Sequence, residues 1–180
     1  MGQYYTPTII KERGRLVGKG NIKAWFYSHD YDNGLKLMEH SYKGNNFVNA
    51  VRNWLIDNGG GNLVWAGDYA DYEEGKEVNL AAIAEGSGAM ASPSDEDRPK
   101  YHYYNNHDKH EFVDLDKCPK DRFGYVIEPL PLLTAEGNGR GGGDYRGNNL
   151  FLVGSWSRDF ITCDTKPIDG YEELTPDFME

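Results

Sequence analysis

The clearest pattern of apolar and polar positions lies between residues 45 and 57, where apolar residues recur every three or four positions. This is the period of an α-helix, so the pattern predicts one main amphipathic helix over 45–57 that packs on a sheet. An asparagine at 45 or 46 can cap its start, and Gly59 can close its end. If Trp54 is buried, its replacement by alanine should cost about 3–5 kcal/mol. The apolar face consists of Phe47, Val48, Val51, Trp54 and Leu55.

Most of the remaining chain alternates short runs of β-branched and aromatic residues with turn residues, which is typical of strands. Pro7 places the first strand at a sheet edge or interrupts it, because proline cannot donate to a ladder. The segment 35–40 fits a strand or one helical turn, and 79–85 fits a short helix. This content predicts an α+β fold with a mostly antiparallel sheet. The expected strands are 4–10, 21–28, 62–67, a hairpin of 100–106 and 110–115, 123–129, and two more around a glycine-rich loop.

The length of 180 residues, without a repeat or linker pattern, predicts a single domain over 1–180. Glycine, serine, proline and charged residues dominate 86–99, so we expect an exposed, flexible loop there. Residues 166–180 form an acidic C-terminal tail, in which Tyr171, Leu174 and Phe178 are candidate anchors.

The net charge of −10 restricts the classes of partner. Phosphate backbones repel an acidic protein, which argues against general nucleic-acid binding. The same charge suits a basic protein surface, although an acidic surface also serves solubility. No apolar run approaches the ~20 residues of a membrane-spanning helix, so we expect no membrane partner.

The two cysteines, Cys118 and Cys163, are too few for a disulfide framework and have no metal-binding spacing. They favour a reducing compartment, and the start of the chain lacks an apolar signal segment, so we expect a cytoplasmic protein. The sequence contains no Gly-x-Ser-x-Gly nucleophile motif and no complete catalytic constellation. It therefore assigns no catalytic residue.

Several short motifs are spread along nearly the whole chain. They are Met1–Tyr5, Gly34–Glu39, Trp65–Tyr69, Asn106–Phe112, Glu136–Gly147 and Gly154–Asp159. Together they resemble an uncharacterised family of phage, prophage and bacterial proteins that begin Met-Gly-Gln-Tyr-Tyr. The resemblance implies no known activity, cofactor or catalytic residue. It does imply a phage-type context, in which the protein acts on a host component.

The loop from Gly137 to Gly147 concentrates glycine and charge between two apolar runs. Successive backbone N–H groups can form an anion-binding nest, and Arg140 or Arg146 can pair with a phosphate or carboxylate. The alternative is a structural hairpin, in which Asp144 bonds to backbone and protein carboxylates saturate the arginines. As a site, the loop should meet charged residues from other segments in one cleft. The ligand-binding candidates are Arg140, Asp144, Arg146, Trp156, Arg158, Asp159 and Asp68.

Two His-Asp dipeptides raise the hypothesis of a metal-dependent hydrolase acting on a nucleotide or phosphodiester. His29, Asp30 and Asp68 would be the ligands, and a bound water would be the nucleophile. Their spacing matches no standard metal motif, and a His-Asp pair in a turn often caps backbone groups instead. No metal or cofactor is therefore predicted.

The leading hypothesis from the sequence is a binding role. The chain would be a small acidic phage-type protein that occupies a host or defence protein, or one that sequesters a small anionic ligand. The acidic charge, the missing catalytic constellation and the family resemblance favour it, and the metal-dependent hydrolase is the alternative.

Overall fold

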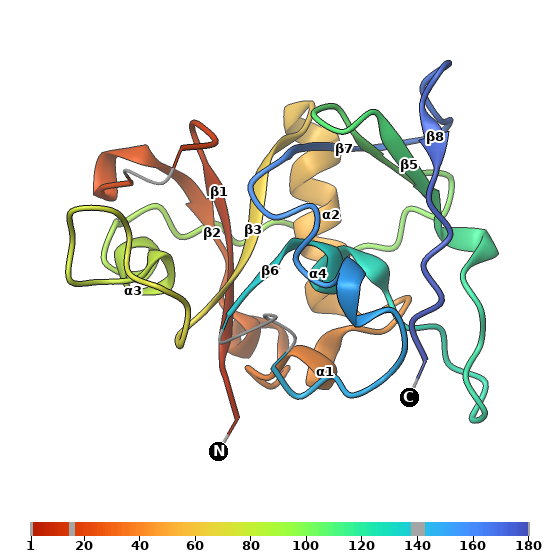
Figure 1. Ribbon diagram of the computed structural model, residues 1–180, viewed down its shortest axis with the longest axis horizontal. Helices are drawn as coiled ribbons and strands as arrows, with labels where there is room; N and C mark the ends of the chain where they lie inside the picture. The colour runs from red at the N-terminus through yellow and green to blue at the C-terminus, as the bar shows by residue number, and fades with distance from the viewer. Residues whose placement is uncertain (1, 15–16, 138–142, 180) are drawn as a thin grey trace.

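The computed structural model describes residues 2–14, 17–137 and 143–179. Within them the strands are β1 (Tyr5–Ile10), β2 (Ile22–Trp25), β3 (Gly61–Gly67), β4 (Tyr103–Asn106), β5 (Glu111–Asp114), β6 (Ala135–Glu136), β7 (Phe160–Asp164) and β8 (Glu172–Glu173). In these described residues, eight strands form one mostly antiparallel sheet in the order β2-β1-β3-β7-β4-β5-β8, with β6 beside β3 (Figure 1). The fold is α+β, as predicted.

The helices of the described chain are short apart from one. They are α1 (Leu37–His40), α2 (Asn46–Asn58), α3 (Leu80–Glu85) and α4 (Pro129–Thr134), with 3₁₀ turns η1 (Lys19–Asn21), η2 (Ser28–Tyr31), η3 (Leu115–Lys117) and η4 (Leu150–Leu152). The start of α2 is capped by Asn45 Oδ1, which accepts the N–H of Phe47 at 2.9 Å. Gly59 ends α2 in the left-handed conformation, with φ 71°. The predicted helix is thus confirmed to within one residue, whereas Trp54 is only partly buried.

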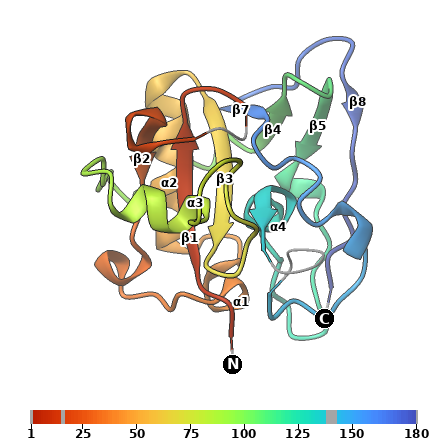
Figure 2. The same cartoon turned by 60° about the vertical axis from the view of Figure 1, so that its left-hand side comes forward.

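The two faces of the sheet carry different helices. Successive strand residues point to opposite faces, so β1 and β3 divide their side chains between two apolar clusters. Ile9 and Leu63 pack in the cluster that includes α2, and Ile10 and Val64 pack in the one that includes α3. Figure 2 shows α3 in front of β1, with α2 on the far side of the sheet. β1 and β3 therefore contribute apolar side chains to both clusters, one on each face of the sheet.

Pro7 lies within an interior strand, because β1 pairs with both β2 and β3. Its carbonyl accepts the N–H of Phe26 at 3.0 Å, just beyond the last β2 residue in the ladder, Trp25. The N–H that proline lacks would point to this same side, at the end of β2. The prediction of an edge strand is therefore wrong for the strand as a whole, and proline is tolerated because the ladder ends there.

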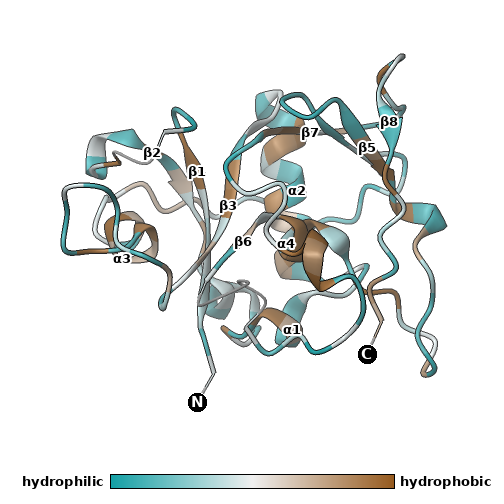
Figure 3. Cartoon of the chain, in the orientation of Figure 1, coloured by the Kyte–Doolittle hydropathy of each residue, from teal (hydrophilic) through white to brown (hydrophobic). Residues whose placement is uncertain are grey.

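Two expected strands are wrong. Residues 123–129 make only isolated bridges, Val126 with Lys120 and Ile127 with Tyr42. The apolar run that precedes the glycine-rich loop forms α4, which is buried on all sides and is coloured hydrophobic throughout most of its length in Figure 3. A continuous apolar run has no period that distinguishes a buried helix from a buried strand. Proline in the first turn and the Glu128 side chain, which accepts the Leu130 N–H at 3.3 Å, favour the helix.

The long loop and the C-terminal tail both contact the body of the protein. Residues 86–99 have no regular structure, and Asn53 of α2 donates to the carbonyls of Ser94 and Glu96 within this loop at 2.7 and 2.9 Å. In the tail, Phe178 is buried and its ring packs edge-on against Tyr145. No helix in the described residues is both long and apolar enough to cross a membrane.

His40 sits at the centre of the larger core. The indole N–H of Trp65 donates to His40 Nε2 at 2.9 Å, so the imidazole is neutral and carries its proton on Nδ1. That nitrogen donates to the Gly34 carbonyl at 3.1 Å. Burial lowers the pKa of His40 to about 4, although the Gly34 carbonyl and Glu39 oppose the shift. The folded core therefore excludes the charged form of this histidine.

This depressed pKa predicts a loss of stability in acid. Between about pH 6.5 and pH 4 the unfolded chain binds a proton on His40 that the folded chain does not, so the unfolding free energy falls as pH falls. The loss attributable to His40 should approach 3 kcal/mol, at about 1.4 kcal/mol per pKa unit. Denaturant titrations at pH 7 and pH 4 give the change in unfolding free energy for wild type and for His40→Gln. The part of that change that His40→Gln lacks is the contribution of His40. The exposed His29→Gln is the control. Equal pH dependence in wild type and His40→Gln would contradict a neutral His40.

Candidate functional site

The two described ends of the glycine-rich loop lie against the start of the chain and of β1. Gly137 is close to the Gln3 side chain, and Gly143 is close to the Tyr5 ring. Arg140 lies outside the described residues. Gly143 has φ +57°, and a Cβ there would lie 2.8 Å from the hydroxyl oxygen of Tyr5. Glycine is thus required at this position by both backbone conformation and close approach. This end of the loop has a structural reason for its glycine that needs no ligand.

Asp144 and Arg146, which follow the loop, are engaged by backbone. Asp144 Oδ1 accepts the N–H of Met38 at 3.0 Å, within the first turn of α1. Arg146 Nη1 donates to the carbonyls of Gly143 and Tyr145 at 2.7 and 3.1 Å. Asp144 bonds to backbone, as the structural alternative expected, but the loop is not a hairpin, because β6 pairs with β3 and η4 follows the loop. Saturation by carboxylates is seen at another arginine of the candidate set.

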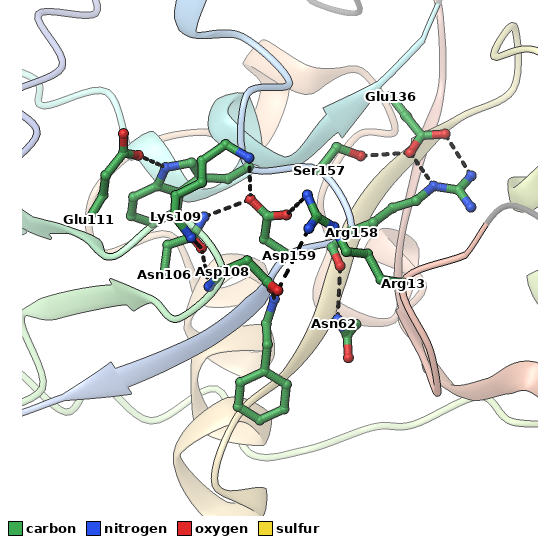
Figure 4. A network of polar contacts seen from close by, with 12 residues as sticks. Arg13, Asn62, Asn106, Asp108, Lys109, Glu111, Glu136, Ser157, Arg158 and Asp159 are labelled. Atoms are coloured by element: carbon green, nitrogen blue, oxygen red, sulfur yellow. Dashed lines mark hydrogen bonds and ion pairs between the residues drawn. The ribbon is translucent and has the colours of Figure 1, made fainter. Parts of the chain in front are cut away.

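That arginine is Arg158, which lies just before β7 with its guanidinium buried. It forms ion pairs with Glu73 and Glu136, and its Nε lies 2.6 Å from Glu136 Oε2. Nη2 also donates to Glu136 Oε1 at 2.8 Å, which makes the Glu136 contact bidentate (Figure 4). Burial alone would lower the pKa of the guanidinium, but its hydrogen bonds to Glu136 and Glu73 outweigh burial and raise it. Arg158 is a saturated cross-link and not a free anion site.

Asp159 is the next residue and is also buried and neutralised. Its Oδ2 accepts from Asn106 Nδ2 and from Lys109 Nζ, both at 2.8 Å. Its Oδ1 lies 2.8 Å from Arg13 Nη2, an ion pair without the alignment of a hydrogen bond. Nearby, the Trp156 indole donates to Glu111 Oε2 at 2.7 Å. The segment from Trp156 to Asp159 thus joins β7 to β4, β5 and the turn after β1.

Asp68 lies apart from this network, at the end of β3. Burial, and then the negative charges of Asp144 and Asp68, raise the pKa of Tyr5, so both carboxylates are near that ring. These two predicted residues are thus both within electrostatic range of Tyr5. The structure places Trp156, Arg158 and Asp159 in a separate, internally satisfied network. The described residues therefore do not form the single charged cleft expected from the sequence.

Asp68 instead lines a cleft of about 410 Å³ at the β2–β1 end of the sheet. This volume is in the range of small-ligand sites. Asp68 and Glu85 contribute carboxylates, and the remaining walls are mostly aromatic or apolar. The lining residues are Tyr4, Thr6, Trp25, Tyr27, Leu35, Asp68 and Glu85.

The two carboxylates of this cleft have only neutral partners. Asp68 Oδ1 accepts the backbone N–H of Tyr4 at 2.9 Å, and Glu85 Oε1 accepts the Thr6 hydroxyl at 2.8 Å. Neither makes an ion pair with any residue that the structure describes. The indole nitrogen of Trp25 is buried and likewise lacks a hydrogen-bond partner there. Two carboxylates among aromatic rings form a site suited to a cation.

Sequence reasoning missed every residue of this cleft except Asp68. A signal was present, because Tyr4 and Thr6 are two apart, as are Trp25 and Tyr27. Alternate positions on a strand share a face, so each pair projects from one side of the sheet. What the sequence could not supply was the pairing of β1 with β2 and the position of α3, whose last residue is Glu85.

The structure does not assemble the metal candidates His29, Asp30 and Asp68. His29 and Asp30 are exposed, and His29 Nδ1 lies 2.9 Å from the Tyr27 hydroxyl. In the described residues, the one group with ligand atoms within 4.8 Å of one another is His102, Asp114 and Asp116. Lys43 Nζ lies 2.8 Å from Asp116 Oδ1 and supplies a cation already. That group is an ion-pair cluster.

The two cysteines are poorly suited to nucleophilic chemistry. Burial raises the pKa of each thiol, Cys118 and Cys163, to about 12. Both are therefore protonated at neutral pH, and a thiol is a much weaker nucleophile than a thiolate. Neither lines the cleft that holds Asp68.

Comparisons of the chain with protein-family models, with curated proteins and with solved structures found no match. The resemblance to phage and prophage proteins therefore stays a prediction from the motifs.

Proposed function

We propose that this protein is a binding protein that occupies a basic surface on another protein. The observation that carries the proposal is the cleft in which Asp68 and Glu85 share aromatic walls without a cationic partner among the described residues. If the phage-type context holds, the partner is a host or defence protein. The occupant of the cleft would be a lysine or arginine side chain of that partner.

The chemistry of the cleft favours a cationic side chain. An ammonium or guanidinium group interacts with the faces of aromatic rings and forms charge-assisted hydrogen bonds to carboxylates. Tyr4, Trp25 and Tyr27 supply the rings, and Asp68 and Glu85 supply the acceptors. The long apolar stem of lysine or arginine suits aromatic walls as well as the charged head suits the carboxylates.

The surface beside the cleft is also aromatic and acidic. The loop of residues 68–78 follows Asp68 directly, and Tyr69 and Tyr72 within it are 49% and 63% exposed. Asp71, Glu74 and Glu77 in the same loop are also exposed. With a net charge of −10, electrostatic steering toward a basic surface should speed association and weaken as salt rises.

The other version of the binding hypothesis, an anionic ligand held at the predicted arginines, has less support. Arg158 is saturated by Glu73 and Glu136, and Arg146 donates to the carbonyls of its own loop. Removing either arginine from its partners to bind an external anion would cost the contacts just described. An external cation could bind in the cleft without breaking an ion pair, because the carboxylates of Asp68 and Glu85 have no counter-ion among the described residues.

The test is capture of partners from host lysate with the immobilised protein at low and high salt. The variant Asp68→Asn/Glu85→Gln removes both charges from the cleft and keeps an oxygen at each accepting position. The control variant Asp169→Asn/Glu172→Gln removes two exposed charges beside β8, at the opposite end of the sheet. Both variants have the same net charge, so only the position of the lost charges differs.

We expect wild type and the control variant to retain one partner at low salt. The cleft variant should bind it roughly tenfold more weakly, or worse, because two charge-assisted contacts are lost. Equal capture by the two variants would show that only overall charge matters, and would reject the cleft as the binding site. A catalytic turnover by the purified protein without any partner would reject the binding role itself.

A further inference from the structure

A second pocket shares no lining residue with the cleft that holds Asp68. It lies where a hairpin at residues 120–126 meets the start of α2. Its turn is tightly specified: Asp121 Oδ1 accepts the N–H groups of Phe123 and Tyr125 at 2.8 and 2.9 Å. Gly124 takes a left-handed conformation with φ +86°. The hairpin is tied to the segment before α2, where the Lys43 N–H donates to the Val126 carbonyl at 2.9 Å. The turn therefore holds its side chains in defined positions.

The side chains held there are aromatic and open to solvent. Phe123 is 69% exposed and Tyr125 is 61% exposed. The Tyr125 ring lies edge-on to Tyr42, with ring centroids 5.9 Å apart. These rings line a pocket of about 560 Å³ together with Lys43, Gly44, Asn45, Asp121 and Arg122. Exposed aromatic residues grouped in a pocket are unusual, and they are typical of binding surfaces.

This pocket contains two cationic side chains, Lys43 and Arg122, together with the carboxylate of Asp121. Arg122 lies with its guanidinium carbon 4.8 Å from the centre of the Phe123 ring, and it makes no ion pair with the described residues. Lys43 adds a second cation, although Asp116 is 2.8 Å from it. One oxygen of Asp121 is occupied by the backbone of the turn. An arginine that makes no ion pair with a described residue therefore lies beside exposed rings, on a chain with a net charge of −10.

The geometry points to a binding site for a small aromatic anion of mononucleotide size in this pocket. A planar base would stack on the exposed rings of Phe123 and Tyr125, and its phosphate would pair with Arg122. Stacking accepts any base, while an arginine fork binds phosphate in a bidentate manner. The pocket volume suits a ligand of this size. This site is independent of the cleft that holds Asp68.

Calorimetric titration of the full chain with AMP, adenosine and inorganic phosphate tests this site. AMP should bind saturably, and adenosine and phosphate should each bind at least about tenfold more weakly, because each lacks one of the two contacts. CMP should bind within a few-fold of AMP, since stacking is tolerant of base identity. Equal affinity for AMP and adenosine, or no saturable binding of either mononucleotide, would overturn the proposal.

Substitutions at two exposed residues test where AMP binds. Arg122→Gln and Phe123→Ala should each weaken AMP binding about tenfold, through loss of the phosphate contact and of the stacking surface. Lys76→Gln and Tyr72→Ala are the matched controls, because both residues are exposed in the loop of residues 68–78. AMP affinity that is unchanged in Arg122→Gln or Phe123→Ala would overturn the site. Self-association of the protein that Phe123→Ala abolishes, without AMP binding, would assign these rings to an interface between copies and also overturn it.

Discussion

Replacing Arg158 by methionine is expected to lower the free energy of unfolding by about 3–5 kcal/mol, because it leaves two carboxylates without their cation in a buried setting. The Glu73 side chain is 0% exposed and Glu136 is 17% exposed, so water can replace little of the lost interaction. Denaturant titration at neutral pH measures the effect. Arg98→Met is the matched control, since its pair with Asp57 is solvent-accessible and worth about 1 kcal/mol or less.

A second substitution separates the charge effect from lost packing. Adding Glu73→Gln to Arg158→Met removes one of the stranded charges, so the double variant should recover part of the lost stability. A cost below about 1 kcal/mol for Arg158→Met would contradict the assignment of Arg158 as a structural cross-link. It would also reopen the possibility that its guanidinium serves a ligand.

Replacing Trp65 by alanine should also cost about 3–5 kcal/mol or more. Trp65 is fully buried in the larger core, and its indole N–H is the partner of His40 Nε2. The alanine variant would create a cavity and leave a buried acceptor unpaired, which adds about 1–3 kcal/mol. Thermal or chemical denaturation of Trp65→Ala measures the sum.

Two further variants divide that sum into its parts. Trp65→Phe keeps most of the ring volume and removes the N–H, so it should show mainly the cost of the unpaired His40. Trp54→Ala should cost less than Trp65→Ala, because Trp54 is partly exposed and contacts Phe26 edge-on, with centroids 6.4 Å apart. If Trp54→Ala proves the more destabilising of the two, the proposed centre of the core is wrong.

The elements that the sequence predicts well are those whose signals are local. The helix α2 has a capping asparagine, an apolar face and a closing glycine, all within 15 residues, and the structure places it at Asn46–Asn58. The hairpin of β4 and β5 likewise follows from adjacent strand patterns and the turn between them. By contrast, α4 is a short apolar run whose helical state depends on burial by the rest of the chain.

The partners of the charged residues could not be predicted from the sequence. Arg158 and Asp159 were visible in the sequence as candidates, but their partners Glu73 and Asn106 are 85 and 53 positions away. A sequence does not show which carboxylate neutralises which arginine, and that decides whether the arginine is free to bind a ligand. The cleft could not be predicted for the same reason, because it forms only when β1, β2 and the end of α3 are brought together.

We propose above that the cleft of Asp68 and Glu85 holds a cationic side chain. A ¹H–¹⁵N chemical-shift titration with N-acetyl-arginine amide tests this most directly. The buried Trp25 indole N–H and the Tyr4 amide that bonds to Asp68 are reporters inside the cleft. We expect saturable shifts of both signals in wild type and in Asp169→Asn/Glu172→Gln, and their loss in Asp68→Asn/Glu85→Gln. Shifts that fail to saturate, that spread evenly over the acidic surface, or that persist in Asp68→Asn/Glu85→Gln would contradict it.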